Sequence, residues 1–219
     1  MIADCTAIVM AGGDSQRMGS DKASLLLDGQ TLLHSVIATM QQLFPQVIVS
    51  VRQPRAGIDL PQVCDEQPDG GPLAGLVASL GQITTPWAFM VACDMPFVVP
   101  EVVELLAGCR IKPPSVPPCQ AGGDRSSPDK GRLGGVSYQA VVPIVHGHPQ
   151  PLAAFYAASC LAPMRASLAA QQKGLRGVLK QLDVRYVDEA EMLEADPLLR
   201  SFFDLDTPQD FAAALSGVR

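Results

Sequence analysis

Apolar and polar residues alternate along the chain in blocks that predict strands and helices in turn. The first block, residues 5–10, is an apolar run that stops at Ala11-Gly12-Gly13, which is typical of a buried strand entering a glycine-rich loop. Residues 47–51 and 87–92 are two further apolar runs, and we predict strands for both. Because these runs are apolar on both faces, they favour a largely parallel sheet with helices on each side.

Helices are predicted between these strands. Thr31 can cap a helix whose apolar positions recur every three or four residues, Gly70-Gly71-Pro72 opens a second helix, and Pro100 starts a third. The other predicted elements are extended residues 25–27 before an Asp28-Gly29 turn, extended residues 138–144 and 184–187, two helical pieces in 158–182 separated near Gly174, and a final helix from Thr207-Pro208. The pattern predicts an α/β protein, a Rossmann-like three-layer α/β/α sandwich with a mostly parallel sheet.

The pattern fails in residues 111–137, which are rich in proline, glycine and serine and have no apolar period. This stretch is much longer than the usual connection between elements, and such loops are often functional. No repeat or second boundary is evident. We therefore predict one domain over residues 1–219 that carries a surface insertion at about 111–137.

Composition narrows the class of protein. The chain is 47% hydrophobic, so it can bury a sizeable core, and its net charge of -6 argues against a nucleic-acid partner. No window approaches the roughly 18 apolar residues of a membrane span, and the first residues lack the pattern of a signal peptide. The six cysteines are scattered without CxxC spacing, which favours reduced thiols and a cytoplasmic protein.

The segment from Ala11 to Lys22 is the main candidate site, since it follows a buried strand and so lies where open α/β sheets bind ligands. Gly12 and Gly13 allow backbone N–H groups to approach phosphate oxygens closely. Ser15 adds a hydroxyl donor, and Arg17 and Lys22 add two cations. The glycine spacing matches neither a P-loop nor a dinucleotide fingerprint, so by itself the loop predicts an anion site of unspecified kind.

An acid follows the third predicted strand. Asp94 lies just beyond residues 87–92, at the expected carboxyl end of a central strand. This position suits Mg2+, which prefers one or two carboxylates together with substrate phosphates and water. The sequence thus combines a phosphate-binding loop with a candidate metal ligand.

The loop resembles the signature of the nucleotidyltransferase superfamily in its molybdenum cofactor guanylyltransferase branch, the MobA-like enzymes. The segments that carry the resemblance, in order, are Ala11-Gly12-Gly13-x-Ser15-x-Arg17-Met18-Gly19-x-Asp21-Lys22, Gly71-Pro72-Leu73-Ala74-Gly75, Cys93-Asp94-Met95-Pro96, Gln150-Pro151-Leu152 and Asp206-Thr207-Pro208. It covers nearly the whole chain outside 111–137. It implies a nucleotidyltransferase (GT-A-like) fold and a Mg2+-dependent transfer of GMP from GTP to molybdopterin phosphate, with release of pyrophosphate.

The resemblance also implies residue roles. The implied catalytic residues are Arg17, Lys22 and Asp94. The implied nucleotide-binding residues are Met10, Ala11, Gly12, Gly13, Ser15, Lys22, Ser50, Asp65, Gly71, Pro72, Leu73 and Asp94. Asp94 is the implied metal ligand with Asp206 as a second candidate, and the acceptor side is formed by Gln150, Pro151, Asp204 and Asp206. Asp65 lies where related enzymes contact guanine. A carboxylate can accept hydrogen bonds from the N1–H and N2 amino groups of that base. Arg52 is a further candidate for contact with phosphate or pterin.

The tail departs from the family pattern. Guanylyltransferases of this branch commonly have Asn-x-Asn-Thr-Pro, whereas this chain has Asp204-Leu205-Asp206-Thr207-Pro208, a form also found in cytidylyl and sugar-nucleotide relatives. The alternatives are therefore a molybdopterin cytidylyltransferase, a sugar-1-phosphate guanylyltransferase and, in another class, a non-catalytic nucleotide or cofactor carrier. Molybdoenzymes or their chaperones are candidate partners for the insertion. The assignment of molybdopterin as the acceptor rests on the resemblance alone.

Overall fold

The computed structural model describes residues 1–12, 21–65, 67, 70–112, 137–172 and 174–215. Within them, one eight-stranded sheet has the order β10-β7-β9-β6-β1-β4-β5, with β8 paired to β7. These strands are β1 (Cys5–Met10), β4 (Gln46–Val51), β5 (Gln62–Cys64), β6 (Trp87–Ala92), β7 (Ala140–Val145), β8 (His148–Pro149), β9 (Ala153–Ala157) and β10 (Val184–Val187). The short β2 (Leu26–Leu27) and β3 (Gln30–Thr31) form a separate hairpin through the predicted turn at Asp28 and Gly29.

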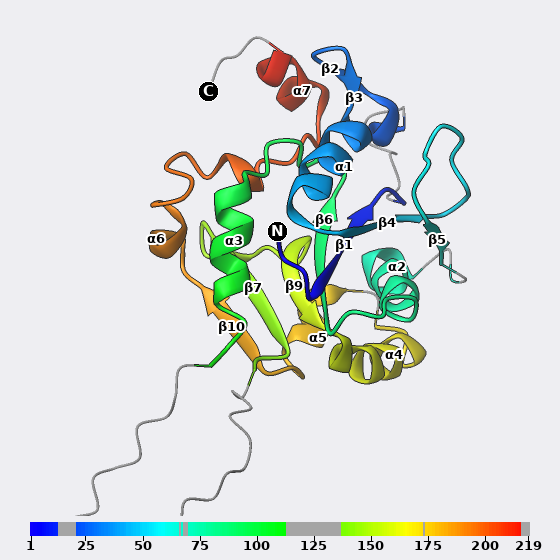
Figure 1. Cartoon of the computed structure of the whole chain (residues 1–219), viewed down its shortest axis with the longest axis vertical. Helices are drawn as coiled ribbons and strands as arrows, with labels where there is room; N and C mark the ends of the chain where they lie inside the picture. The colour runs from blue at the N-terminus through cyan, green and yellow to red at the C-terminus, as the bar shows by residue number, and fades with distance from the viewer. Residues whose placement is uncertain (13–20, 66, 68–69, 113–136, 173, 216–219) are drawn as a thin grey trace, which may run out of the picture.

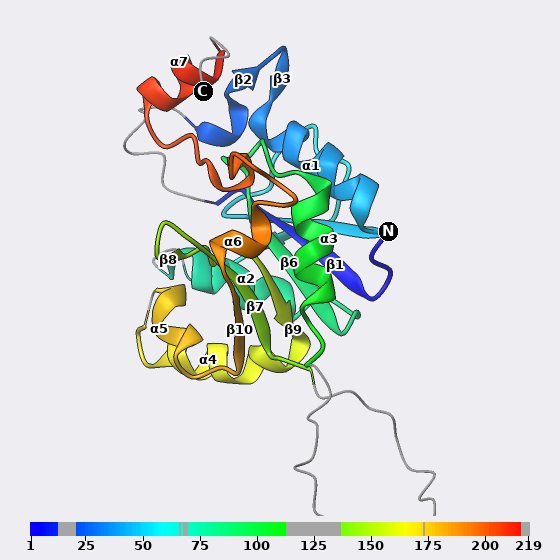
Figure 2. The ribbon, with the colours of Figure 1, turned by 90° about the vertical axis from the view of Figure 1, so that its left-hand side faces the viewer.

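Helices cover both faces of the sheet. They are α1 (Leu32–Leu43), α2 (Gly71–Leu80), α3 (Pro100–Gly108), α4 (Leu161–Ala169), α5 (Leu175–Leu179), α6 (Glu189–Met192) and α7 (Pro208–Leu215), with single 3₁₀ turns at Lys22–Ser24 (η1), Ala158–Cys160 (η2) and Arg200–Phe202 (η3). Figure 1 shows the sheet between them, and in Figure 2 α1 and α3 lie on one side while α2, α4 and α5 lie on the other. The predicted three-layer α/β/α sandwich is confirmed.

The helix starts follow local chemistry. The Thr31 hydroxyl accepts a hydrogen bond from the His34 backbone N–H at 3.2 Å, which satisfies one of the free donors at the start of α1. At α7, the Asp210 backbone donates to the Thr207 hydroxyl while the Asp210 carboxylate accepts from the Thr207 backbone. This reciprocal pair is a capping box. Both predicted caps are therefore confirmed.

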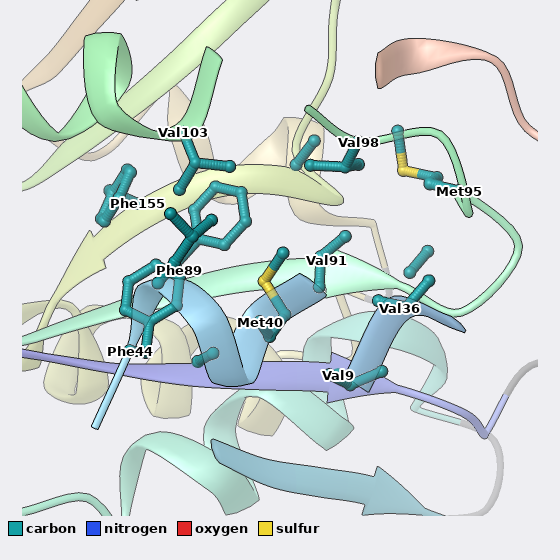
Figure 3. Packing of buried hydrophobic residues seen from close by; sticks show 14 of the residues in the cluster. Val9, Val36, Met40, Phe44, Phe89, Val91, Met95, Val98, Val103 and Phe155 are labelled. Atoms are coloured by element: carbon teal, nitrogen blue, oxygen red, sulfur yellow. The ribbon is translucent and has the colours of Figure 1, made fainter. Parts of the chain in front are cut away.

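The core on the α1 and α3 side is built around three aromatic rings. Phe89 of β6 lies 5.7 Å from Phe44, at the end of α1, and 4.8 Å from Phe155 of β9, measured between ring centroids. Figure 3 shows these rings packed with Met40 and Val103, and all five side chains are buried. This packing fixes β6 at the centre of the sheet, with its carboxyl end beside that of β1.

The pattern of apolar and polar residues predicts no element at residues 153–157, where the structure has β9. This strand runs antiparallel to both β6 and β7, while β1 is parallel to β4 and β6, β4 is parallel to β5, and β7 is parallel to β10. Its sequence, Ala-Ala-Phe-Tyr-Ala, is buried throughout and shows no period-2 alternation. The mostly parallel sheet thus has an antiparallel strand in its middle.

The two ends of the predicted insertion are adjacent. Ile111 and Ser137 form an isolated antiparallel bridge, and Tyr138 N–H donates to the Arg110 carbonyl at 3.0 Å. Residues 113–136 lie outside the described part of the chain, so the prediction of an insertion there stays a prediction. No helix among the described residues combines the length and the apolar character needed to cross a bilayer.

Candidate nucleotide site

A cavity of about 300 Å³ opens at the carboxyl ends of β1, β4 and β6, where open α/β sheets place their ligand sites. Its polar and charged lining residues come from four separate segments, at residues 21–22, 50–52, 65 and 93–94. The lining consists of Met10, Ala11, Gly12, Asp21, Lys22, Ala23, Ser50, Arg52, Asp65, Gly71, Pro72, Ala92, Cys93, Asp94 and Leu152. The structure therefore brings together most of the described residues that the sequence nominated for nucleotide binding.

Main-chain hydrogen bonds hold the base of the cavity. Ala11 N–H donates to the Ser50 carbonyl at 2.8 Å, and Cys93 N–H donates to the Met10 carbonyl at 3.0 Å. The end of β1 is thereby tied to both neighbouring strands. Helix α2 packs directly against this floor at Gly75, where a Cβ atom would lie only 2.6 Å from Met10 Cε and 2.7 Å from Ser50 Oγ. A glycine is needed here because the helix backbone approaches two cavity-lining side chains.

Lys22 is the ionic centre of the site. Its Nζ donates to Asp94 Oδ2 at 3.0 Å and also to Asp206 Oδ1. The Lys22 side chain is 15% exposed and that of Asp94 is 19% exposed, so this ion pair is largely shielded from solvent. Burial alone lowers the pKa of the Lys22 ammonium, but the hydrogen bonds and charges of the two aspartates outweigh it and raise the pKa overall. Lys22 is thus firmly cationic.

Asp206 reaches this centre through the packing of the C-terminal segment. Leu205 N–H donates to the Asp94 carbonyl at 2.9 Å, and the buried Leu205 side chain packs with Leu27 and Leu32. Figures 1 and 2 both show α7 beside the β2–β3 hairpin. The cluster fixes residues 205–206 over the end of β6, although Lys22 and Asp206 are remote in sequence.

Arg55 is a site residue that the sequence analysis missed. Its guanidinium forms a forked pair with Asp21, with Nη2 at 3.0 Å from Oδ1, and Nη2 also donates to the Ala11 carbonyl at 3.1 Å. These hydrogen bonds lower the pKa of the Asp21 carboxyl. Asp21 in turn caps η1, the short helix that begins at Lys22. A signal was available, since Asp21 belongs to the loop that carries the resemblance. Of the two arginines that follow the second predicted strand, however, the sequence favoured Arg52, and nothing in the spacing pointed to Arg55.

Asp65 follows β5 and lines the cavity near the start of α2, together with Gly71 and Pro72. Gly71 has a φ of +61°, a left-handed conformation that glycine adopts without a steric penalty. Arg52 lines the same cavity. The residues proposed for base recognition and this additional cation therefore share one pocket with Lys22 and Asp94.

Some predicted site residues lie elsewhere. Leu73 is fully buried in the core under α2 and does not line the cavity. Gln150 and Pro151 do not line the cavity either, whereas the next residue, Leu152, does. The Leu152 carbonyl accepts a hydrogen bond from the Ala92 N–H at 3.0 Å. Asp204 is exposed, and the pKa of its carboxyl is raised, first by partial loss of solvent and then by the charges of neighbouring aspartates. Gly13, Ser15 and Arg17 lie outside the described residues.

The acids of the site suit an open magnesium position. Oxygens of Asp94 and Asp206 converge on one point, the Lys22 ammonium. In the part of the chain that the structure describes, no group of three or more His, Cys, Asp or Glu side chains could enclose a metal. Two carboxylates without further protein ligands are what Mg2+ accepts when phosphates and water complete its shell. Cys93 beside them is a poor ligand, because burial raises the pKa of its thiol to about 12.

The α/β/α sandwich and this charged pocket at the carboxyl edge of its parallel strands define an α/β protein with a ligand site of the kind that open parallel sheets form. Comparison with known proteins narrows that class. Residues 7–186 match the model of the MobA-like NTP transferase domain. A probable molybdenum cofactor guanylyltransferase of Chloroflexus aggregans is 35% identical over 94% of this chain and 90% of its own. The chain belongs to the MobA-like NTP transferase family, and it is a nucleotidyltransferase.

Other relatives agree with this assignment. A molybdenum cofactor guanylyltransferase of Syntrophotalea carbinolica is 28% identical, covering 94% of this chain and 88% of its own. The crystal structure of molybdopterin-guanine dinucleotide biosynthesis protein A from Archaeoglobus fulgidus has a TM-score of 0.75 at 24% identity, covering 96% of this chain and 97% of its own. The 2-C-methyl-D-erythritol 4-phosphate cytidylyltransferase of Thermus thermophilus shares the fold at a TM-score of 0.61 and 15% identity, over 97% of this chain and 98% of its own. The fold alone therefore does not select the base.

Proposed function

We propose that this protein is a molybdenum cofactor guanylyltransferase, which transfers GMP from GTP to the terminal phosphate of molybdopterin and releases pyrophosphate. The observation that carries the proposal is one cavity lined by a cation, an acid and a base-side carboxylate: Lys22, Asp94 and Asp65. The names of several relatives over most of the chain support guanine as the base and molybdopterin as the acceptor.

The proposed chemistry requires positioning and charge neutralisation rather than covalent catalysis. The acceptor phosphate attacks the α-phosphorus of GTP, a new P–O bond forms, and the bond to the β-phosphate breaks to release pyrophosphate. Backbone N–H groups at Gly12 would contact the phosphates, and Lys22 would hold the reacting ones. Asp94 and Asp206 would bind Mg2+, which neutralises phosphate charge when bound. No general base is required, because a phosphate nucleophile is already ionised near neutral pH.

Base selection is proposed to depend on Asp65. Its carboxylate can accept hydrogen bonds from the N1–H and N2 amino groups of guanine, a pair that adenine and cytosine do not present. We expect Asp65→Ala to reduce the preference for GTP over CTP and ATP in pyrophosphate release. A chain that uses CTP as well as GTP before any substitution would instead favour the cytidylyltransferase alternative.

The central test is pyrophosphate release with GTP, Mg2+ and molybdopterin. Asp94→Ala should lower the rate about 10²–10³-fold, since an electrostatic contact made in the transition state is lost. Asp183→Ala removes an exposed aspartate paired to Lys112 at 2.5 Å, far along the sheet, and is the matched control. Equal rates for the two variants would refute the role of Asp94. Melting temperatures of both variants separate loss of activity from loss of fold.

A separate assay identifies the acceptor and distinguishes an enzyme from a carrier protein. Molybdopterin and a sugar 1-phosphate should be compared as acceptors, and transfer only to the sugar would identify a sugar-1-phosphate guanylyltransferase. A carrier protein would bind GTP without releasing pyrophosphate with any acceptor. We also propose that the product is delivered to a molybdoenzyme or its chaperone in the cytoplasm, with the insertion at about 111–137 as the docking segment.

A further inference from the structure

The position between Asp94 and Asp206 is filled by an internal cation. The Lys22 ammonium donates to both carboxylates, and the two acids with one lysine carry a net charge of one negative unit. Lys22 and Asp94 are mostly shielded from water, whereas the Asp206 side chain is 43% exposed, so solvent screens the charges of the Lys22–Asp94 pair least. A divalent cation that bound the same two oxygens would meet the ammonium at close range, and the like charges would repel each other.

The lysine can leave without unfolding its surroundings. Its backbone is held by η1, where Asp21 accepts from Ala23 N–H at 3.3 Å and from the Ser24 hydroxyl at 2.9 Å, and Ala23 is buried. The ammonium itself is on a flexible four-carbon stem. Rotation of the Lys22 side chain would move its charge from the carboxylates towards phosphates bound in the same cavity.

We propose that Lys22 occupies the position of the divalent cation in the nucleotide-free protein, and that the metal therefore binds tightly only together with a triphosphate. The inference rests on the proposed function, because it takes the Asp94–Asp206 pair to be the metal position and a nucleoside triphosphate to be the ligand. It adds a coupling: phosphates that accept the ammonium vacate the carboxylates, and by linkage the metal strengthens binding of the phosphates.

The test measures Mn2+ binding by calorimetry or electron paramagnetic resonance with no nucleotide present. Lys22→Met keeps the apolar stem and removes the charge, and we expect it to tighten Mn2+ binding at least about tenfold relative to the wild-type protein. Arg52→Met is the matched control, because it removes an equal charge from the lining of the same cavity. It should change Mn2+ affinity far less. Equal gains in both variants, or no gain in Lys22→Met, would overturn the inference.

A double variant locates the metal. Adding Asp94→Asn to Lys22→Met should abolish the gain in Mn2+ affinity, and a gain that persists would place the ion elsewhere and contradict the inference. If Lys22→Met does not fold, as judged by its melting curve, the wild-type protein with ¹³C-methylated lysines provides the second measurement. Saturating Mg2+ should then shift the Lys22 resonance towards that of an exposed lysine, and an unchanged resonance would be contrary evidence.

The outcomes also separate this inference from the proposed function. If Lys22→Met binds Mn2+ no more tightly than the wild-type protein, and the wild-type protein does transfer GMP, then the inference about Lys22 is rejected and the proposed function stands. If Lys22→Met binds Mn2+ about tenfold more tightly, but the wild-type protein releases no pyrophosphate from GTP, then the proposed reaction is rejected and the inference about Lys22 stands.

Discussion

At the scale of single residues, Gly75 lies outside the cavity but packs against Met10 and Ser50, which line it. We predict that Gly75→Ala weakens GTP binding about tenfold and destabilises the fold by about 1–3 kcal/mol, because the new methyl group would displace Met10 and Ser50 towards the ligand. Binding can be measured by calorimetry and stability by urea unfolding. Gly108→Ala is the control, since a Cβ atom at Gly108, also in a helix, has no neighbour within 4 Å. Equal effects at both positions would count against close packing at Gly75.

Thiol reactivity gives a second prediction at this scale. Burial raises the pKa of the thiols of Cys93 and Cys160 to about 12, whereas Cys64 is exposed at the end of β5. Because the thiolate is the reactive form, iodoacetamide at neutral pH should label Cys64 rapidly and leave Cys93 and Cys160 unmodified until the protein unfolds. Peptide mass spectrometry after timed labelling measures each site. Fast labelling of Cys93 in the native protein would contradict the burial of its thiol.

At the scale of elements, the short helix η1 depends on Arg55. We predict that Arg55→Met raises the KM for GTP more than it lowers kcat, because Asp21 then holds the Lys22 end of the loop less firmly. In Arg55→Lys the KM for GTP should rise less than in Arg55→Met, because the positive charge is kept, although an ammonium cannot form the forked pair. Arg110→Met is a suitable control, since Arg110 pairs with Asp4 at 3.1 Å away from the cavity. An equal rise in KM for the control would argue against a local role.

The ion pair between Arg55 and Asp21 predicts that the stability of the fold depends on pH. Hydrogen bonds from Arg55 lower the pKa of Asp21 below its ordinary value of 3.8, so the pair stabilises the folded state above that pH. The contribution is lost as the pH falls through the lowered pKa. The contribution of the pair to the free energy of unfolding should therefore be no more than about 1 kcal/mol at pH 7, because the pair is partly exposed. The free energies of unfolding of the wild-type protein and Arg55→Met should differ less at strongly acid pH, where only the hydrogen bond from Arg55 to the Ala11 carbonyl still distinguishes them. Urea unfolding at several pH values tests this, and a difference that grows in acid would refute it.

At the scale of the whole molecule, the bridge between Ile111 and Ser137 predicts that the insertion can be shortened. A short glycine-serine linker can replace residues 113–136, because the chain ends that it must join are already adjacent. We expect an unchanged melting temperature and unchanged pyrophosphate release, with slower transfer of product to an acceptor molybdoenzyme. Loss of GTP turnover would show that the segment belongs to the catalytic site, and unaltered transfer would exclude a docking role.

Much of the fold could be predicted from the order of residues. The runs of β1, β4 and β6 are apolar on both faces, and α1 and α7 begin at Thr caps, so local propensity and tertiary structure agree there. Strand β9 could not be predicted, because its buried alanines and aromatics fit a strand or a helix equally well. Leu73 belongs to a motif that carries the resemblance, but its side chain is buried in the core and does not line the cavity, so its contact with the nucleotide stays a prediction.

The sequence by itself determined the chemistry of the site. Its glycine loop, the lysine at its end and the acid after β6 follow strands whose carboxyl ends must meet at one edge of a parallel sheet. Only the tertiary structure decided which charges are partners. Asp206 reaches Lys22 because Leu205 is buried against the hairpin side chains, and Arg55 reaches Asp21 across a loop. Such contacts join positions distant in the sequence, and packing of the whole chain, not local propensity, determines their distances.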